Sequence, residues 1–175
     1  MITAHDTIYH GSNMNGKPVH NDGDGQSAKS LKKKILIVDD DASVRNSIGN
    51  VLREAGYDVL QSGDGQEALA KFDAREIDLL MLDLNLPNKS GWDTFEGFTS
   101  RNPTLPTIII TGQSRQSQMA MAAGAGALME KPLDVSELLQ TMQELLTEPE
   151  EARLRRMSGY SKDGRFVSRY IRPRK

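Results

Sequence analysis

Short runs of apolar residues recur along the middle of the chain, and each is followed by a stretch in which apolar residues return every three or four positions. A short β-branched run bounded by polar residues is typical of a buried strand, whereas the longer spacing is typical of an amphipathic helix. We therefore predict five strands, at residues 35–38, 57–60, 77–82, 106–111 and 127–129.

The stretch after the first strand shows the helical pattern most clearly. Val44, Ile48 and Leu52 fall on one face of a helix. Asp41 precedes them as a candidate N-cap, and Gly56 follows as a candidate C-terminal stop. Further helices are predicted to begin at residues 64–65, to span 92–101 and 113–123, and to follow a capping-box pattern at Asp134 and Glu137. The predicted inner face of the last helix holds Val135, Leu138, Leu139, Met142 and Leu146.

The alternation of strands and helices indicates the fold class. Continuous apolar strands that alternate with amphipathic helices imply a parallel sheet covered by helices on both faces. Right-handed crossovers then make it a doubly wound, three-layer α/β sandwich. In such folds the functional sites lie at the carboxyl ends of the strands, near the topological switch point. The residues that follow the predicted strands are therefore the first candidates for chemistry.

The two ends of the chain differ from this central body. Residues 1–31 are rich in Gly, Asn, Asp, Ser and His and show no periodicity, so we expect a disordered N-terminal extension. The pattern predicts one compact domain over residues 32–148 and a basic tail over 149–175. The body is acidic, since residues 31–148 contain 11 Lys and Arg against 18 Asp and Glu, whereas 149–175 contain 9 against 3.

The composition also excludes several classes of protein. The chain has no cysteine, which excludes disulfides, thiol nucleophiles and cysteine metal sites. Its first residues contain no apolar run of the kind found in a signal peptide. No stretch approaches the roughly 18 apolar residues of a membrane span. We therefore expect a cytoplasmic protein without membrane insertion.

Polar residues stand at the ends of four predicted strands. The first strand is followed by Asp39 and Asp40, and the third is followed by Asp83. The fourth strand ends at Thr111, and Lys131 follows the fifth. Because the carboxyl ends of parallel strands meet at one edge of the sheet, we expect these side chains to lie close together.

The acidic triplet after the first strand has two interpretations. Its carboxylates can cap the following helix, or they can hold a cation together with Asp83. Capping requires no partner on another strand, so we assign Asp41 to the cap and Asp39 and Asp40 to a metal site. Close carboxylates with open water positions suit magnesium (Mg²⁺). A carboxylate beside such an ion can attack phosphorus and form an acyl phosphate, while a nearby Lys and Thr hold the phosphoryl oxygens.

Over roughly residues 33–148 the sequence resembles the receiver domains of bacterial response regulators. The segments ILIVDDD, LLMLDLNLPNKSGW, IIITG and AGAGALMEKPLD each resemble a family signature, and the four occur in the family's order and spacing. The resemblance implies a flavodoxin-like fold with strand order 2-1-3-4-5. It also implies a single-domain receiver in a two-component phosphorelay, with a histidine kinase or histidine phosphotransfer protein as donor and a protein effector downstream.

The resemblance further implies the roles of the site residues. Asp83 would accept the phosphoryl group, and Asp39 and Asp40 would organise Mg²⁺ together with Asp83 itself. Asn85 would supply its backbone carbonyl to the ion. Asn85 and Gln113 would also tune the rate of dephosphorylation. The domain would not be an enzyme in the usual sense, because it would catalyse only its own phosphorylation and dephosphorylation.

The remaining signature residues would bind the phosphoryl group or shape the site. Thr111 and Lys131 would bind the group and act in the switch, and the Lys131–Pro132 bond would be cis. Pro87 and Gly91 would shape the loop after the acceptor.

One position departs from the family pattern. Leu128 stands where the family usually has Tyr or Phe. Leucine has no ring to rotate inward, so transmission of the signal would use a different change of surface.

Other functions stay open at this point. Residues 152–175 contain nine Lys and Arg, one acid and three interleaved aromatic residues. This tail can be solvated, dock on the acidic body, or contact nucleic acid or a partner, and we favour the first two. A phosphorylation-independent interaction scaffold is a second alternative. A phosphohydrolase with an aspartate nucleophile ranks lower, because such enzymes usually carry Asp-x-Asp after the first strand, which here ends in adjacent aspartates.

Overall fold

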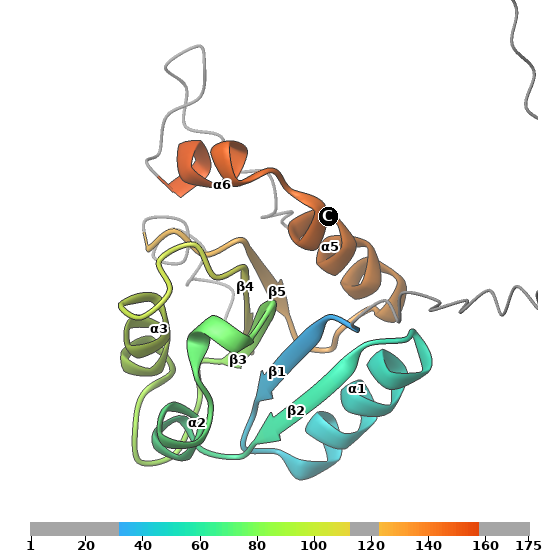
Figure 1. Cartoon of the computed structure of the whole chain (residues 1–175). Coiled ribbons are helices and arrows are strands. Elements are labelled where there is room, and N and C mark those ends of the chain that lie inside the picture. Colours follow the sequence, from blue (N-terminus) through green and yellow to red (C-terminus); the bar gives the residue numbers. More distant parts are fainter. Residues whose placement is uncertain (1–31, 113–122, 158–175) are drawn as a thin grey trace, which may run out of the picture. The chain divides into compact units, whose positions relative to one another are not determined.

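A computed structural model gives the arrangement of residues 32–112 and 123–157 (Figure 1). Its strands are β1 Lys34–Val38, β2 Asp58–Ser62, β3 Leu79–Asp83, β4 Thr107–Thr111 and β5 Ala127–Glu130. Its helices are α1 Ala42–Glu54, α2 Gly65–Lys71, the 3₁₀ helix η1 Ala74–Glu76, α3 Gly91–Thr99, α5 Val135–Thr147 and α6 Glu150–Met157. All five predicted strands are present, with bounds shifted by one or two residues.

The five strands form one parallel sheet in the order β2-β1-β3-β4-β5. This order confirms the doubly wound sheet and the strand order expected from the sequence. Val38 is paired with Leu82 in the register of β1 and β3, so the two strands end at the same level. Asp39 and Asp83, the next residues along each strand, are thereby brought to the same edge of the sheet.

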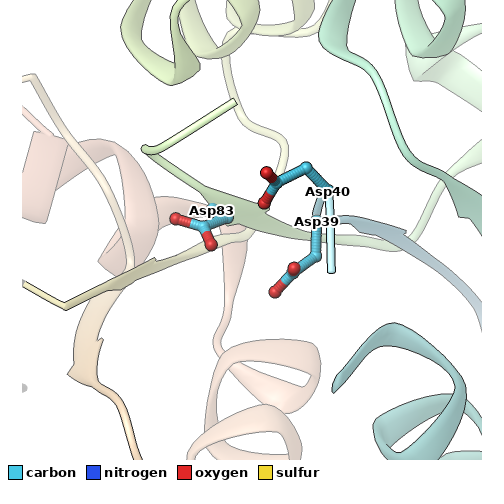
Figure 2. Close-up of side chains that lie close together, drawn as sticks. All are labelled: Asp39, Asp40 and Asp83. Carbon is cyan, nitrogen blue, oxygen red and sulfur yellow. The ribbon is translucent and has the colours of Figure 1, made fainter. Parts of the chain in front are cut away.

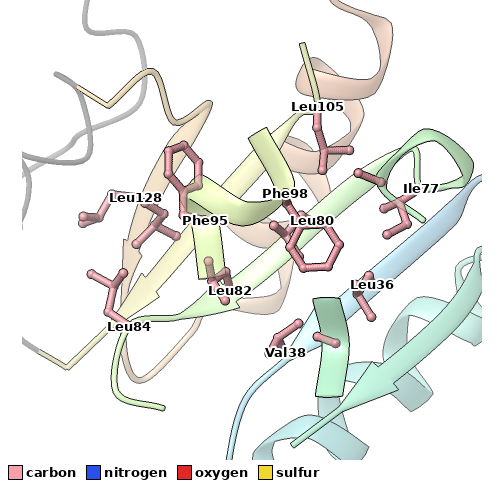
Figure 3. Packing of buried hydrophobic residues seen from close by; sticks show 13 residues of the cluster. Leu36, Val38, Ile77, Leu80, Leu82, Leu84, Phe95, Phe98, Leu105 and Leu128 are labelled. Atoms are coloured by element: carbon pink, nitrogen blue, oxygen red, sulfur yellow. The ribbon is translucent and has the colours of Figure 1, made fainter. Parts of the chain in front are cut away.

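Helices cover both faces of the sheet, with α1 and α5 on one face and α2 and α3 on the other (Figure 1). The side chains of successive β1 residues point alternately to the two faces of the sheet. Leu36 and Val38 pack toward α2 and α3, and Ile35 and Ile37 pack toward α1 and α5. Figure 3 shows the first of these clusters. Because both faces are buried, the strands are continuous apolar runs rather than alternating ones.

Helices α1 and α5 begin after the N-caps predicted from the sequence, whereas α3 spans Gly91–Thr99 instead of the predicted residues 92–101. Oδ1 of Asp41 accepts a hydrogen bond of 2.8 Å from the Ser43 amide, which caps α1. Gly56, which follows α1, has φ 94°, a left-handed conformation that costs glycine little. Oδ1 of Asp134 accepts a bond of 2.9 Å from the Glu137 amide at the start of α5. The two aspartate caps fix where α1 and α5 begin, next to the sheet edge that carries the acidic residues.

Three features differ from the predictions or lie beyond them. The helix predicted at 113–123 lies outside the described residues, apart from residue 123. Val135, predicted for the inner face of α5, is 47% exposed. It is the first residue of α5, whose buried residues are Leu138, Thr141, Met142 and Leu145. Helix α6 was not predicted, because five of its eight residues are charged. Among the described helices, none is both long and apolar enough to cross a membrane.

Helix α6 is attached to the body by Arg153. The Nη1 atom of Arg153 donates a hydrogen bond of 3.0 Å to the Thr104 carbonyl, in the loop before β4. Its Nη2 atom donates to the Leu145 carbonyl at 3.2 Å, near the end of α5. Arg153 Nε lies 3.8 Å from a carboxylate oxygen of Glu148. The chain beyond α5 therefore begins as a docked helix.

Candidate functional site

Three carboxyl groups meet at the carboxyl ends of β1 and β3 (Figure 2). Asp39 and Asp40 follow β1, and Asp83 is the last residue of β3. Each contributes an oxygen that lies within 4.8 Å of the other two. Asp39 and Asp83 are buried, whereas Asp40 is exposed. The predicted convergence of these three residues is therefore found, and it leaves the group open to solvent on the Asp40 side.

Lys131 brings a positive charge to the same edge. Its Nζ atom lies 2.9 Å from Oδ2 of Asp39 and donates a hydrogen bond to Oδ2 of Asp83. Partial burial lowers the pKa of Lys131, but hydrogen bonds and charge from Asp83 and Asp39 outweigh burial, so its pKa is raised above the ordinary value. The ammonium therefore stays charged at neutral pH and is shared by two buried carboxylates.

The site contains three carboxyl groups but one ammonium, which bridges two of them. The group is therefore suited to a further cation. Oδ2 of Asp39 is buried and lies 2.9 Å from the Lys131 ammonium, which is shared with Oδ2 of Asp83. Carboxylates removed from water are costly unless cations balance their charge, and one ammonium does not balance the three carboxylates of this group. Carboxylate oxygens with one side open to water suit a hard ion such as Mg²⁺. The residues present therefore fit that ion.

The backbone of Asp39 is held on both sides. Its amide donates to the Ser62 carbonyl of β2 at 3.2 Å, and its own carbonyl accepts from Nη1 of Arg45 at 2.5 Å. Its Oδ1 atom accepts a bond of 2.9 Å from the Asp41 amide. These contacts leave Oδ2 as the oxygen that faces Lys131 and Asp83. The carboxylate is thus oriented before any ligand arrives.

The loop after β3 folds back closely on the end of that strand. The Asn85 amide donates to Oδ1 of Asp83 at 2.9 Å, and the Gly91 amide donates to the Leu84 carbonyl at 3.2 Å. A Cβ atom on Gly91 would lie 2.6 Å from the Asp83 carbonyl oxygen, so no side chain fits there. Pro87 lies within this loop, and its carbonyl accepts from the amide two residues later. The loop's close return makes a glycine necessary at position 91.

The other predicted residues lie on the adjoining strands. Thr111 ends β4 and is buried, and its carbonyl accepts a bond of 2.9 Å from the Lys131 amide. The Lys131–Pro132 peptide bond is cis, as the resemblance implied. Leu128 is buried in the core cluster on the α3 face (Figure 3). Gln113 lies outside the described residues.

Sequence reasoning missed four residues around the site. Arg45 and Ser62 hold the backbone of Asp39, as described above. Asp64 and Asn88 join the loops after β2 and β3, because Nδ2 of Asn88 donates to Oδ2 of Asp64 at 2.6 Å. The one available signal was Asn88 in a Pro- and Gly-containing turn, where Asn is favoured for its tolerance of left-handed backbone. Its partner lies 24 positions away and leaves no local pattern.

Comparison with known proteins places this geometry in a family. Residues 35–143 match the model of the response regulator receiver domain. The chain is 30% identical over 117 residues to the transcriptional regulatory protein PdtaR of Mycobacterium tuberculosis, covering 65% of this chain and 57% of that protein. It is 36% identical over 126 residues to the response regulator MprA of Mycobacterium bovis, covering 70% and 55%. The chain thus spans about half the length of these two relatives.

Solved structures agree with the sequence relatives. A CheY-like receiver domain protein from Methanospirillum hungatei superposes with a TM-score of 0.63 at 33% identity, covering 69% of this chain and 97% of that one. The response regulator TrrA from Thermotoga maritima, solved in complex with Mg²⁺ and BeF, gives a TM-score of 0.60 at 28% identity, covering 65% and 98%. The chain therefore belongs to the response regulator receiver domain family.

Proposed function

We propose that Asp83 accepts a phosphoryl group from a phosphohistidine, and that the histidine belongs to a histidine kinase or a histidine phosphotransfer protein. One oxygen of Asp83 would attack phosphorus, a P–O bond would form, and the P–N bond would break with its electron pair leaving on the imidazole. The observation that carries the proposal is the grouping of Asp83 with Asp39, Asp40 and Lys131 at one edge of the sheet.

Asp39, Asp40 and Asp83 would hold Mg²⁺, together with the backbone carbonyl of Asn85. The bound ion would neutralise charge that develops on the phosphoryl oxygens. The Mg²⁺ and BeF complex of the related TrrA supports this proposal, since it is a complex of a similar fold. The excess of three carboxyl groups over the single Lys131 ammonium supports it from this chain's own residues.

Lys131 and Thr111 would hold the transferred group. The Lys131 ammonium already contacts the acceptor carboxylate, so a phosphoryl oxygen formed there would lie within its reach. Thr111 lies at the end of the neighbouring strand and is buried.

We propose that the compact unit over residues 32–148 then signals from the cytoplasm through contacts with a downstream protein. The transferred group would be lost by a hydrolysis that the domain itself promotes, with Asn85 and Gln113 tuning its rate.

A titration with beryllofluoride, which mimics a phosphoryl group, tests this function without a kinase. Trp92 is the reporter, because it follows Gly91 at the start of α3 and its ring contacts Phe95 with centroids 6.2 Å apart. We expect a change in Trp92 fluorescence that requires both Mg²⁺ and beryllofluoride and is absent in Asp83→Asn. A full response in Asp83→Asn, or a response without Mg²⁺, would contradict the proposed site.

A further inference from the structure

A polar bridge joins the two loops that flank the site on the α2 and α3 side. Oδ2 of Asp64, in the loop after β2, accepts a hydrogen bond of 2.6 Å from Nδ2 of Asn88, in the loop after Asp83. The pKa of Asp64 is lowered, and the hydrogen bond from Asn88 is the largest cause. The carboxylate is therefore the form of Asp64 that the bridge favours.

Asp64 is a firm anchor for this bridge. Its second oxygen, Oδ1, caps α2 by accepting from the amides of Gln66 at 2.7 Å and Glu67 at 3.0 Å. The Asp64 carbonyl accepts a bond of 2.9 Å from the hydroxyl of Ser62. The Ser62 carbonyl in turn accepts a hydrogen bond of 3.2 Å from the Asp39 amide. Asp64 is thus tied both to a helix and to the strand end that holds Asp39.

Asn88 has a backbone conformation that is unfavourable for most residues. Its φ is 64°, and it is the one residue other than glycine in the described chain with a positive φ. Asparagine tolerates this left-handed conformation better than most residues, but it still gives up some backbone stability there. Glycine would meet the backbone requirement fully, so φ alone does not explain a side chain at this position. The bond to Asp64 supplies a reason for an amide.

The loop that Asn88 supports controls the acceptor carboxylate. Three residues before Asn88, the Asn85 amide donates to Oδ1 of Asp83 at 2.9 Å. The loop's far end is held by the Gly91 amide on the Leu84 carbonyl. Displacement of Asn88 would therefore move Asn85, and with it both the donor to Asp83 and the neighbouring backbone carbonyl.

From these contacts we infer that Asp64 and Asn88 are positioning residues for the acceptor loop, and that their bridge raises the affinity of the Asp39–Asp40–Asp83 group for Mg²⁺ and the rate of phosphoryl transfer. This inference rests on the function proposed above. The bridge does not touch the reacting atoms. It acts through the loop that carries Asn85, whose amide contacts Asp83. Asp64 thereby couples the start of α2 to the acceptor loop through one carboxylate.

Two variants separate the bridge from the backbone conformation. Asn88→Gly keeps the left-handed backbone accessible and leaves the charge unchanged, but removes the amide donor. The double variant Asp64→Asn with Asn88→Asp exchanges the two groups. The amide introduced at position 64 can then donate to the carboxylate introduced at position 88, while its oxygen still caps α2. Net charge is preserved in both variants.

The readouts are the Mg²⁺ dependence of Trp92 fluorescence and the rate of phosphorylation by acetyl phosphate. We expect Asn88→Gly to weaken Mg²⁺ binding and to slow phosphorylation, each by about two- to tenfold, the range of one lost hydrogen bond. The exchange variant should recover at least half of each loss on a logarithmic scale. Its recovery would identify the bridge, because the exchange restores the hydrogen bond between positions 64 and 88 while it alters both side chains.

The possible failures of this test are distinct. If the unmodified chain neither binds Mg²⁺ nor becomes phosphorylated, the proposed function itself is wrong. If the unmodified chain does both and Asn88→Gly matches it, the positioning role is overturned while the function stands. A variant that melts at a lower temperature yet keeps its Mg²⁺ affinity and rate would also overturn the positioning role, since the bridge would then serve stability only.

Discussion

Nζ of Lys131, which follows β5, lies 2.9 Å from Oδ2 of Asp39, which follows β1. The two residues meet although β3 and β4 lie between these strands in the sheet. The same ammonium donates to Asp83 on β3. One flexible cation therefore holds two buried carboxylates that would otherwise repel each other. This relationship makes Lys131 a structural counter-ion and a candidate ligand for the transferred phosphoryl group.

Removal of that cation should separate metal binding from phosphoryl transfer. In Lys131→Met the carboxylates lose their counter-ion, so we expect the free energy of unfolding to fall by about 1–3 kcal/mol, below the value for a fully buried pair because Lys131 is partly exposed. Mg²⁺ should bind more tightly, since it replaces the lost charge, while phosphorylation should slow. Urea unfolding with and without Mg²⁺, together with acetyl-phosphate kinetics, measures both effects.

Lys33→Met is the matched control for this experiment. Lys33 pairs with Asp78 at 2.8 Å, and the pair is partly solvated, since the Lys33 side chain is exposed and the Asp78 side chain is half-buried. Exposed pairs contribute at most about 1 kcal/mol, and this one lies at the opposite end of β1 from the site. Weaker Mg²⁺ binding in Lys131→Met would contradict the role of Lys131 as a competing counter-ion.

A methyl group at Gly91 should disturb the backbone of Asp83. The new Cβ in Gly91→Ala would lie 2.6 Å from the Asp83 carbonyl oxygen, and a backbone atom cannot rotate away as a side chain can. We expect a loss of about 2–4 kcal/mol in the free energy of unfolding, with weaker Mg²⁺ binding. Gly112→Ala is the control, since no heavy atom among the described residues lies within 4 Å of a Cβ there. Equal stability losses in the two variants would show that the close return of the loop is not the cause.

Much of this site follows from the sequence, because strand ends are set by local patterns. The buried runs that end at Val38 and Leu82 predict where β1 and β3 stop, and parallel pairing then brings Asp39 and Asp83 together. The bridge between Asp64 and Asn88 could not be predicted in this way. It joins two loops, and its geometry depends on how α2 and the acceptor loop pack after folding.

Helix α6 illustrates a different limit of sequence reasoning. Its residues are mostly charged, and Leu154 is 49% exposed, so no apolar stripe marks the helix. Arg153 anchors it through the backbone carbonyls of Thr104 and Leu145, together with its pairing to Glu148. Carbonyls occur at every position and carry no residue signal, so such an anchor becomes visible only in the structure.

Arg153→Ala should release α6 without affecting the acceptor site. Loss of the two carbonyl contacts and the pairing with Glu148 should lower the free energy of unfolding by about 1–3 kcal/mol. Hydrogen exchange should accelerate in residues 150–157, while the Mg²⁺ response of Trp92 should stay unchanged. Arg155→Ala is the control, because Arg155 is exposed and pairs with Glu151 within the helix. Unchanged exchange in Arg153→Ala would refute the anchoring role.

The lowered pKa of Asp64 predicts a defined pH dependence. A carboxyl whose pKa is lower in the folded state stabilises that state above the unfolded pKa of about 3.9, and loses this contribution as pH falls through the folded pKa. A carbon-detected NMR titration should place the Asp64 midpoint below that of an ordinary aspartate. In Asn88→Gly the midpoint should move upward, because its largest cause is removed. An unchanged midpoint would show that the Asn88 bond is absent in solution.

Asp83 is the proposed acceptor of the phosphoryl group. The most direct test of this role is intact-mass spectrometry of the full chain after incubation with acetyl phosphate and Mg²⁺, with peptide mapping of the modified residue. We predict one phosphoryl adduct that maps to Asp83, is released by hydroxylamine as an acyl phosphate, and is absent without Mg²⁺ and in Asp83→Asn. Asp73→Asn, which changes a helix cap away from the site, should label normally. A hydroxylamine-sensitive adduct of full yield in Asp83→Asn would contradict the claim.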